Sequence, residues 1–551
     1  MILNLFQILL FILIIIEFFW GGFTFTIQQK IIPIHQIDIP GIIFLLTIFW
    51  NLYKKKPTYI LNVLNKIWNK LENIGKNKNS LLYITLVFII IFTIVHSFKH
   101  LSFHTHGYDM AFVNQSLFKM FRPKLLSCDI CLNNTYFGEH ISWGFLLFAP
   151  IAILKSNYAL FLVQSFLILF PIFIFLNSKK ISPPRIYSLM IFLIILSSRS
   201  LRNSLIWDLR EDDLTFFFLC LMLLSYYNRK IYFFLVFLLG ALLCKENVSL
   251  VTFGFGVYTF FDKDLLKKER IFFTTLTIAI SLAYLFLTFG YFIPKYTAGH
   301  QSEQVILMRF GKYGITPKEV ISNMITTPSI WWDLIKNNLF TIDRIKYIFL
   351  LLLPFIYFIL QDLIILIPIS IGLLMNILPN SSTQRMMIFH YDLIILPFCI
   401  YALLKMVKKI EERKLKFIFI ISLSISGTWP IYYLKTFLPT LNDIANNQFL
   451  YNETKNKKTA SNLIPLAHLV HLDSIRTFDI EKIDSLEQFN TPRIRGKTTL
   501  YGAEIIVLDT TDPNDSSTLK FLSNNKFPII KLSEDHRFVI LKNILYRADA
   551  Q

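Results

Sequence analysis

The feature that most constrains this chain is a series of long apolar runs separated by short polar stretches. Several of the runs, among them residues 1–20, 81–98, 158–176 and 271–293, are long enough to cross the hydrocarbon core of a bilayer as helices. Helices suit this environment because they satisfy their own backbone hydrogen bonds. The mean hydropathy is +0.52 and only 17% of the residues are charged, too few for the surface of a soluble chain of this length. The sequence therefore predicts an α-helical polytopic membrane protein.

Further apolar runs extend this prediction to about thirteen crossings. The further spans are expected at residues 1–20, 38–53, 186–198, 214–227, 231–244, 248–261, 347–360, 363–378, 391–404 and 417–434. The run at 143–154 is too short to span comfortably. We interpret it as a helix half-embedded on the outer surface, which keeps the basic residues that follow 176 on the inner side.

The net charge of +19 raises the question of a nucleic-acid partner. The basic residues, however, lie in short clusters between apolar runs, as the positive-inside rule predicts for cytoplasmic loops. Seven lysines between Lys54 and Lys78 place that segment inside. Within it, Ile60 to Leu71 has the spacing of an amphipathic helix on the membrane surface. We therefore expect the N-terminus inside, membrane lipid as a partner and no nucleic acid.

The last part of the chain differs in composition from the rest. Residues 435–551 carry more charge, and the runs at Glu504–Leu508, Phe527–Leu532 and Phe538–Leu541 have the pattern of short β-strands. About 115 residues are enough for a small domain with its own core. We predict a transmembrane domain over 1–434 and a small extracytoplasmic α/β domain after it.

The candidate site lies in the polar segment His104–Trp143, within a predicted outer loop over 99–157. A connector between two membrane helices does not need so many ionisable groups. Asp109, near the start of this segment, could cap the helix that begins at Met110, or it could act as a catalytic or binding carboxylate. Glu139 and His140, near the end, could be an interfacial pair without chemistry or part of the same site.

Charged residues also cluster at later membrane boundaries on the same predicted side. Solvated or snorkelling side chains are one interpretation, because helices commonly end with such residues. The other is function, since ionisable groups beside membrane helices are candidates by default. The residues concerned are Arg202, Asp208, Arg210, Glu211, Asp212, Lys245, Glu246 and His390.

The candidate residues fall into an ordered set of motifs. The set comprises Tyr108-Asp109, Phe137-Gly138-Glu139-His140, Trp207-Asp208, Leu243-Cys244-Lys245-Glu246, His390-Tyr391 and Ser461-Asn462-Leu463-Ile464-Pro465. In this order it resembles a bacterial and archaeal family of polytopic membrane proteins of unknown function that is grouped with the GT-C glycosyltransferases. The resemblance covers residues 80–510 in outline and implies a location in the cytoplasmic membrane of a prokaryote.

The chain departs from the family pattern at three places. Glu139 replaces an aspartate, Asp208–Asp212 replaces an Asp-aromatic-His-Pro-Glu element, and Asn247 replaces the last acid of a Lys-Glu-Asp element. These departures weaken a metal or acid–base role for the second and third elements more than for Asp109.

The resemblance implies that a sugar is transferred from a polyprenyl-phosphate donor on the extracytoplasmic face. Such a reaction needs a general base near the acceptor hydroxyl, cations at the lipid phosphate and an apolar groove for the prenyl chain. It implies Asp109 as the base, accompanied by Glu139 and His140 as catalytic candidates. It also implies Lys245 with Arg202 or Arg210 at the phosphate. The full substrate-binding set is then Arg202, Asp208, Arg210, Glu211, Asp212, Lys245, Glu246 and His390.

These motifs specify no cofactor. A divalent metal ion held by His140 with Asp109 or Glu139 is an option, although no ligand spacing supports it. Two other functions also fit the sequence: a transporter or flippase of a lipid-linked or polar substrate, and a non-catalytic scaffold that presents the C-terminal domain. A transporter should place ionisable groups in mid-span beside broken helices, whereas here they lie mostly at predicted outer boundaries.

Cys128 and Cys131 form a pair with a two-residue spacer in the predicted outer loop. An extracytoplasmic compartment preserves disulfides, and the spacer is short enough for a turn to bring the sulfurs together. The alternatives are free thiols, half of a zinc site completed by His104, His106 or His140, and a redox-active pair. We expect a structural disulfide.

Overall fold

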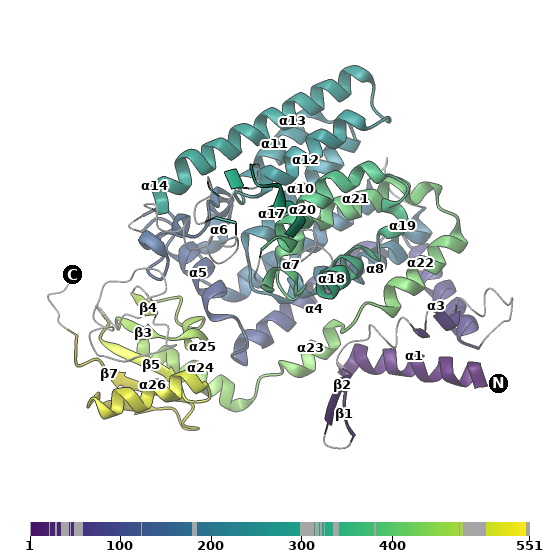
Figure 1. The fold of residues 1–551 in the computed structure, drawn as a ribbon. Coiled ribbons are helices and arrows are strands. Elements are labelled where there is room, and N and C mark those ends of the chain that lie inside the picture. Colours follow the sequence, from purple (N-terminus) through teal and green to yellow (C-terminus); the bar gives the residue numbers. More distant parts are fainter. Residues whose placement is uncertain are drawn as a thin grey trace.

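In the computed structural model the chain is mostly helical, with a small sheet near its C-terminus (Figure 1). The structure describes residues 2–20, 23–27, 30–34, 43–44, 46–48, 59–122, 124–178, 184–297, 313–314, 319, 322–323, 326–333, 341–379, 382–472, 474–477 and 503–546.

The helices up to residue 297 are α1 Ile2–Trp20, α3 Tyr59–Gly75, α4 Ser80–Leu101, α5 Gly107–Phe118, α6 Ala149–Ala152, α7 Asn157–Asn177, α8 Arg185–Leu196, α9 Arg199–Ile206, α10 Glu211–Tyr227, α11 Ile231–Leu242, α12 Val248–Phe261, α13 Lys267–Leu287 and α14 Ile293–Thr297. The later helices are α17 Pro328–Asp333, α18 Ile342–Leu352, α19 Ile356–Ile359, α20 Leu366–Ile377, α21 Leu396–Met406, α22 Glu412–Ser424, α23 Pro430–Thr436, α24 Leu441–Thr454, α25 Leu463–Leu466 and α26 Pro513–Asn524.

Three helices among the described residues are long and apolar enough to cross a membrane: Ser80–Leu101, Asn157–Asn177 and Lys267–Thr297. Each of them overlaps a predicted span, at 81–98, 158–176 and 271–293. The pair α8–α9 makes a fourth if it counts as one broken span, with a bend of 70° between its parts. Among the described residues there are thus fewer full-length spans than the thirteen crossings predicted.

Proline and serine residues shorten several of the other helices. The predicted span 347–360 is divided into α18 and α19, because Pro354 between them lacks the N–H that would continue the helix. The break between α8 and α9 follows Ser197, whose hydroxyl donates to the Ile194 carbonyl at 2.6 Å and so competes with regular backbone bonding. The predicted span 38–53 lies largely outside the described residues. Interruptions explain the shorter helices at these two places.

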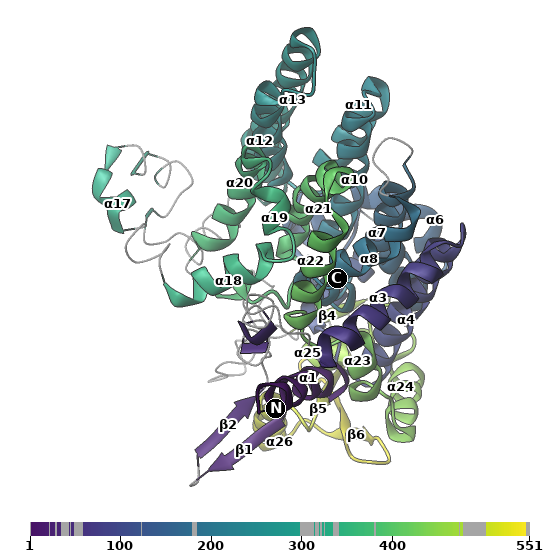
Figure 2. The ribbon, with the colours of Figure 1, turned by 90° about the vertical axis from the view of Figure 1, so that its right-hand side faces the viewer.

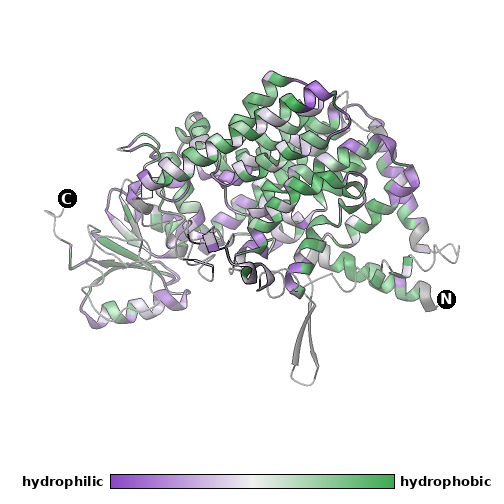
Figure 3. Ribbon diagram, turned by 45° about the horizontal axis from the view of Figure 1, so that its top comes forward, coloured by the Kyte–Doolittle hydropathy of each residue, from purple (hydrophilic) through white to green (hydrophobic). Residues whose placement is uncertain are grey.

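The helical body is apolar inside and over much of its outer surface (Figure 3). Its interior is formed mainly by α4, α7, α8, α10, α12, α20 and α21. Helices α12 and α13 run side by side at one edge (Figure 2). Only 22% of the apolar window of Lys267–Thr297 is buried inside the protein. An apolar surface of this extent is unfavourable in water and favourable in lipid, which agrees with a membrane location.

The segments before the first long span are partly as predicted. Helix α1 covers the first predicted span, and the antiparallel hairpin β1 Phe23–Ile27 and β2 Lys30–Ile34 after it is not predicted. The predicted amphipathic helix is α3. Its Trp68 is buried against Tyr187 and Phe419, so part of its apolar face covers other helices of the protein.

The predicted outer loop between α4 and α7 is well structured. It contains α5 and then the disulfide-bonded turn, and it ends in a 3₁₀ helix at Trp143–Phe148 followed by α6. The run at 143–154 is therefore two short helical pieces and not a spanning helix, as predicted.

The C-terminal sheet has the strand order β4-β3-β5-β7-β6. Its strands are β3 Thr459–Ser461, β4 Ile475–Thr477, β5 Ile505–Asp509, β6 Ile529–Leu532 and β7 Phe538–Lys542. β3 pairs in parallel with β4 and β5, and β7 pairs antiparallel with β5 and β6. The three predicted strands are confirmed as β5, β6 and β7, and with α26 they make the predicted α/β arrangement.

Candidate functional site

The candidate site begins where the chain leaves α4 and enters α5. α5 starts at Gly107, and its N-cap is His106, whose Nδ1 accepts the Asp109 N–H at 3.4 Å. The alternative in which Asp109 caps a helix beginning at Met110 is therefore wrong. The earlier start is fixed by Asp208, whose Oδ2 accepts the His106 N–H at 2.7 Å. Asp109 lies in the first turn of α5, with its carboxylate directed toward the later motifs.

Asp208 is the centre of a buried ion network at this turn. Its Oδ1 lies 3.1 Å from the Lys99 Nζ and 3.2 Å from the His96 Nε2, both from α4. Burial by itself would raise the pKa of the Asp208 carboxyl, but Lys99 and His96 hold that pKa well below its usual range. The Asp208 side chain is 0% exposed. It therefore fastens the loop to α4, and its role in substrate binding stays a prediction.

Asp109 pairs with Arg210 across the site. The Arg210 Nη1 lies 3.2 Å from one Asp109 oxygen, and the Trp207 Nε1 donates to the other at 3.2 Å. The Asp109 side chain is 25% exposed, whereas that of Glu211 in the same network is 0% exposed. Asp109 is thus a fixed and accessible carboxylate at the edge of a buried network.

Glu211 lies at the middle of this network. Its Oε2 accepts the Tyr136 hydroxyl at 2.7 Å and lies 3.4 Å from the Arg210 Nε. Its Oε1 lies 2.8 Å from the Lys245 Nζ and 3.6 Å from the His140 Nε2. Glu211 is the first residue of α10, where the helix dipole favours a negative charge.

Lys245 and His390 complete the buried side of the network. The Lys245 Nζ also lies 2.7 Å from the Asp212 Oδ2, so this ammonium bridges two adjacent carboxylates. The His390 Nε2 lies 3.3 Å from the same Asp212 oxygen. Residues from three distant motifs therefore meet at the start of α10.

His140 connects the loop to the Lys-Glu motif. Its Nδ1 lies 2.8 Å from the Glu246 Oε1, and the Ile141 N–H donates to the Glu246 Oε2 at 3.3 Å. Burial opposes ionisation of Glu246, but His140 and Lys245 beside it lower the pKa of its carboxyl to about 2. Glu246 is thus a charged anchor for the end of the loop.

Two further predicted site residues are buried. Arg202 is buried and donates to the backbone carbonyls of Leu196, Ser426 and Thr428. These carbonyls lie near helix ends, where backbone acceptors lack helical partners, so Arg202 stabilises breaks in the bundle and does not join Arg210 and Lys245. Glu139 is buried beside His140, and its N–H donates to the Tyr136 carbonyl at 2.8 Å.

The arrangement does not fit the metal site considered from the sequence. Within the part of the chain that the structure describes, no group of three His, Cys, Asp or Glu side chains could hold a metal ion. The ring nitrogens of His140 face Glu246 and Glu211, not Asp109 or Glu139. Between Glu211 and Asp212, the Lys245 ammonium occupies the position that a cation would take.

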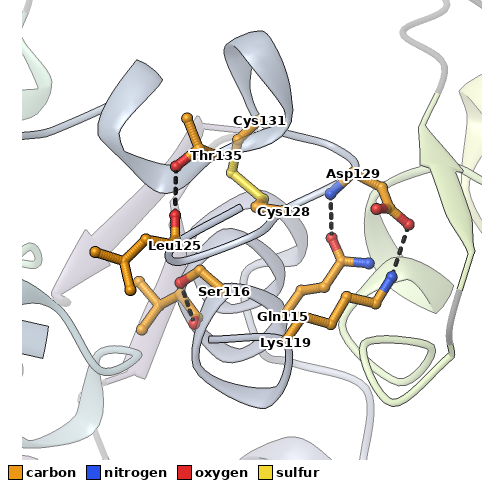
Figure 4. Close-up of a disulfide and its surroundings, with 9 residues drawn as sticks. Gln115, Ser116, Lys119, Leu125, Cys128, Asp129, Cys131 and Thr135 are labelled. Atoms are coloured by element: carbon orange, nitrogen blue, oxygen red, sulfur yellow. Dashed lines mark hydrogen bonds and ion pairs between the residues drawn. A yellow bond between two sulfur atoms is a disulfide. The ribbon is translucent and has the colours of Figure 1, made fainter. Parts of the chain in front are cut away.

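Cys128 and Cys131 are joined by a disulfide (Figure 4). Asp129, between them, donates its N–H to the Gln115 Oε1 at 2.9 Å, and its carboxylate lies 2.8 Å from the Lys119 Nζ. The cross-linked turn is therefore fixed to α5, the helix that carries Asp109.

The C-terminal sheet packs directly on this loop. The Asp129 Oδ2 also accepts the N–H of Ile475 in β4 at 3.1 Å. The His100 and His468 rings stack at 4.1 Å, and Phe103 lies 5.0 Å from Phe538 of β7. The loop is thus held between the helical body and the sheet.

Comparison with known sequences identifies the family. Residues 99–467 match the profile of a family described as "Predicted membrane protein (DUF2079)". The chain belongs to this family. The matched region of this DUF2079 protein includes the ion-network residues from Lys99 to His390, whereas His96 lies just before it, and the family's function is unknown. No curated protein and no solved structure matches the chain. The predicted resemblance to an uncharacterised polytopic membrane protein family is confirmed.

Sequence reasoning missed three residues of the DUF2079 site. His96 and Lys99 belong to the apolar run that ends α4, and their i, i+3 spacing places them on one helix face. Ionisable residues at the end of an apolar run were the sequence feature that could have identified His96 and Lys99 as site residues. Tyr136 contacts Glu211 through its hydroxyl, and nothing in the local pattern distinguishes it from a core aromatic residue.

Proposed function

We propose that this protein is a GT-C-like integral membrane glycosyltransferase. It transfers a sugar from a polyprenyl-phosphate donor to an acceptor hydroxyl on the extracytoplasmic face. The observation that carries the proposal is the position of Asp109. Its carboxylate is partly exposed, fixed by Trp207 and Arg210, and connected to a buried network drawn from the predicted motifs.

The reaction assigns a role to each side of the Asp109–Arg210 pair. Asp109 accepts the proton of the acceptor hydroxyl as that oxygen bonds to the anomeric carbon of the sugar. The bond from this carbon to the phosphate oxygen breaks, and polyprenyl phosphate leaves with the electron pair. Arg210, 3.2 Å from Asp109, stabilises the negative charge that develops on the phosphate.

The remaining network residues hold this pair in place. Lys245 lies between the buried carboxylates of Glu211 and Asp212, so we assign it as their counter-ion. We assign the phosphate contact to Arg210, which pairs with the partly exposed Asp109. His140 and Glu246 connect the end of the loop to the same network. The step needs no metal ion, and the exposed apolar helix faces provide the surface along which a prenyl chain would lie.

The positive-inside rule and the packing of the C-terminal part support the proposed orientation. Basic clusters favour a cytoplasmic position for the turn that follows α10 and for the loop around residue 410. The ion network lies at the other end of α10, and the sheet packs beside it. We therefore assign the network and residues 435–551 to the extracytoplasmic side, and residues 1–434 to the transmembrane domain.

One observation favours a flippase as a second candidate. The broken pair α8–α9 bends by 70°, and beside it the Ser200 hydroxyl donates to the buried carboxylate of Asp392 at 2.6 Å. Broken helices with ionisable groups are features of transporters.

A reconstitution experiment separates the two candidates. Purified protein in proteoliposomes is supplied with a panel of polyprenyl-phosphate sugars and sugar or peptide acceptors. We expect release of polyprenyl phosphate with formation of a glycosylated product, and equal activity with and without a chelator. Movement of intact donor between leaflets without any product would support the flippase and contradict the enzyme.

A further inference from the structure

A pocket lies at the opposite end of α10 from the ion network. α10 has 17 residues, so at 1.5 Å per residue the two ends are about 25 Å apart. The pocket has a volume of about 300 Å³ and lies between the starts of α11 and α13. Its lining residues are Arg229, Ile231, Lys268, Glu269, Phe272 and Phe273. This volume is at the lower end of the range of small-ligand sites.

The pocket combines an apolar interior with a basic entrance. Phe273 is buried, whereas Phe272 is 43% exposed and continues into the apolar outer face of α13. Tyr232, next to the pocket on α11, is 75% exposed. Arg229 and Lys268 supply two positive charges and Glu269 one negative charge. The pocket therefore opens on the lipid-facing surface and carries a positive balance.

The backbone at Arg229 turns the chain from α10 into α11. Arg229 has a φ of 57°, in the left-handed region that favours glycine and is rarely adopted by a bulky side chain. This conformation belongs to the C-cap of α10, where the Arg229 N–H donates to the Tyr226 carbonyl and the Lys230 N–H to the Ser225 carbonyl, both at 2.9 Å. Here it presents a guanidinium that lies 3.5 Å from Glu269 and donates to the Asp264 carbonyl at 2.8 Å.

We infer that this pocket binds an anionic phospholipid of the membrane. An acyl chain packs against Phe272 and Phe273, and the lipid phosphate contacts Arg229 and Lys268. α11 and α13 both begin at the pocket, so their dipoles add to the attraction for a phosphate. In the proposed orientation the site faces the cytoplasmic leaflet, where basic pockets between membrane helices bind acidic head groups.

The test uses full-length protein purified from vesicles of equal parts phosphatidylglycerol and phosphatidylcholine. Native mass spectrometry measures the ratio of the two lipids retained. We expect the unmodified protein to retain more phosphatidylglycerol than phosphatidylcholine. The ratio of phosphatidylglycerol to phosphatidylcholine should fall about fivefold in either Arg229→Gly or Lys268→Ala and about 25-fold in the double variant. These losses correspond to about 1 kcal/mol of binding free energy per basic residue. Arg229→Gly removes the charge and relieves the strained backbone, so folding is retained.

Lys267→Ala is the matched control, because Lys267 neighbours Lys268 but does not line the pocket. It should leave the lipid ratio unchanged. Three results would overturn the inference: an unchanged ratio in the double variant, an equal loss in the control, or equal retention of both lipids by the unmodified protein. Loss of thermal stability in Arg229→Gly without a change in the lipid ratio would assign Arg229 to structure alone.

Discussion

Replacing Asp208 by Asn tests whether the ion network holds the site together. The Asp208 carboxylate is 0% exposed and balances the ammonium of Lys99, whose side chain is 6% exposed. Asn keeps the shape of the side chain but leaves that ammonium buried without its counter-ion. Breaking a buried pair in this way costs about 3 to 5 kcal/mol of unfolding free energy, so Asp208→Asn should be strongly destabilised.

A double-mutant cycle isolates the interaction from other effects of the substitution. Lys99→Met removes the ammonium and keeps an apolar side chain of similar length. The double variant Asp208→Asn/Lys99→Met should therefore lose about 2 to 4 kcal/mol less unfolding free energy than the sum of the two single losses. The assay is reversible denaturation of detergent-solubilised protein, followed by tryptophan fluorescence. Lys66→Met, at an exposed position of α3, is the control and should change stability by less than about 0.5 kcal/mol. A coupling free energy below about 0.5 kcal/mol, as in exposed pairs, would refute the reasoning.

Three further predictions concern the rest of the molecule. Mass spectrometry of non-reduced, alkylated protein should find Cys128 and Cys131 unmodified, and alkylation of both in freshly isolated membranes would contradict the disulfide. Burial raises the pKa of Asp515 to about 7 from 3.8, so the folded state binds the extra proton between these values. The opening free energy of the C-terminal sheet, measured by hydrogen exchange, should therefore fall by about 4 kcal/mol as pH rises through this window, and Asp515→Asn should remove that slope. A cysteine at position 121, where Phe121 is 70% exposed, should be labelled from outside intact cells and one at 410 should not, and the reverse pattern would invert the orientation.

Hydropathy alone predicts the helical class, the long spans and the C-terminal strands. The apolar character of a run does not reveal where it breaks, because the breaks depend on single residues. Pro354 divides one predicted span, and the hydroxyl of Ser197 bonds to the backbone at another break. Predicted crossings and observed helices therefore agree in position more than in length.

The candidate site was predictable as a set of residues but not as a set of roles. Ionisable groups at helix ends identified Asp109, Arg210 and Glu211, which the fold brings together. Roles depend on partners that are distant in the chain. Arg202 donates to backbone carbonyls of segments more than two hundred residues later, and Asp208 contacts Lys99 on α4. No local motif encodes these contacts.

The central claim is that Asp109 is the base of a glycosyl transfer. It is tested most directly by the rate at which polyprenyl phosphate is released in proteoliposomes by the unmodified protein and by Asp109→Asn, at equal amounts of folded protein. Asp343→Asn, an exposed carboxylate in the first turn of α18, is the matched control. The account predicts a loss of about 10²-fold or more in Asp109→Asn and an unchanged rate in the control. Equal rates in all three proteins would contradict it.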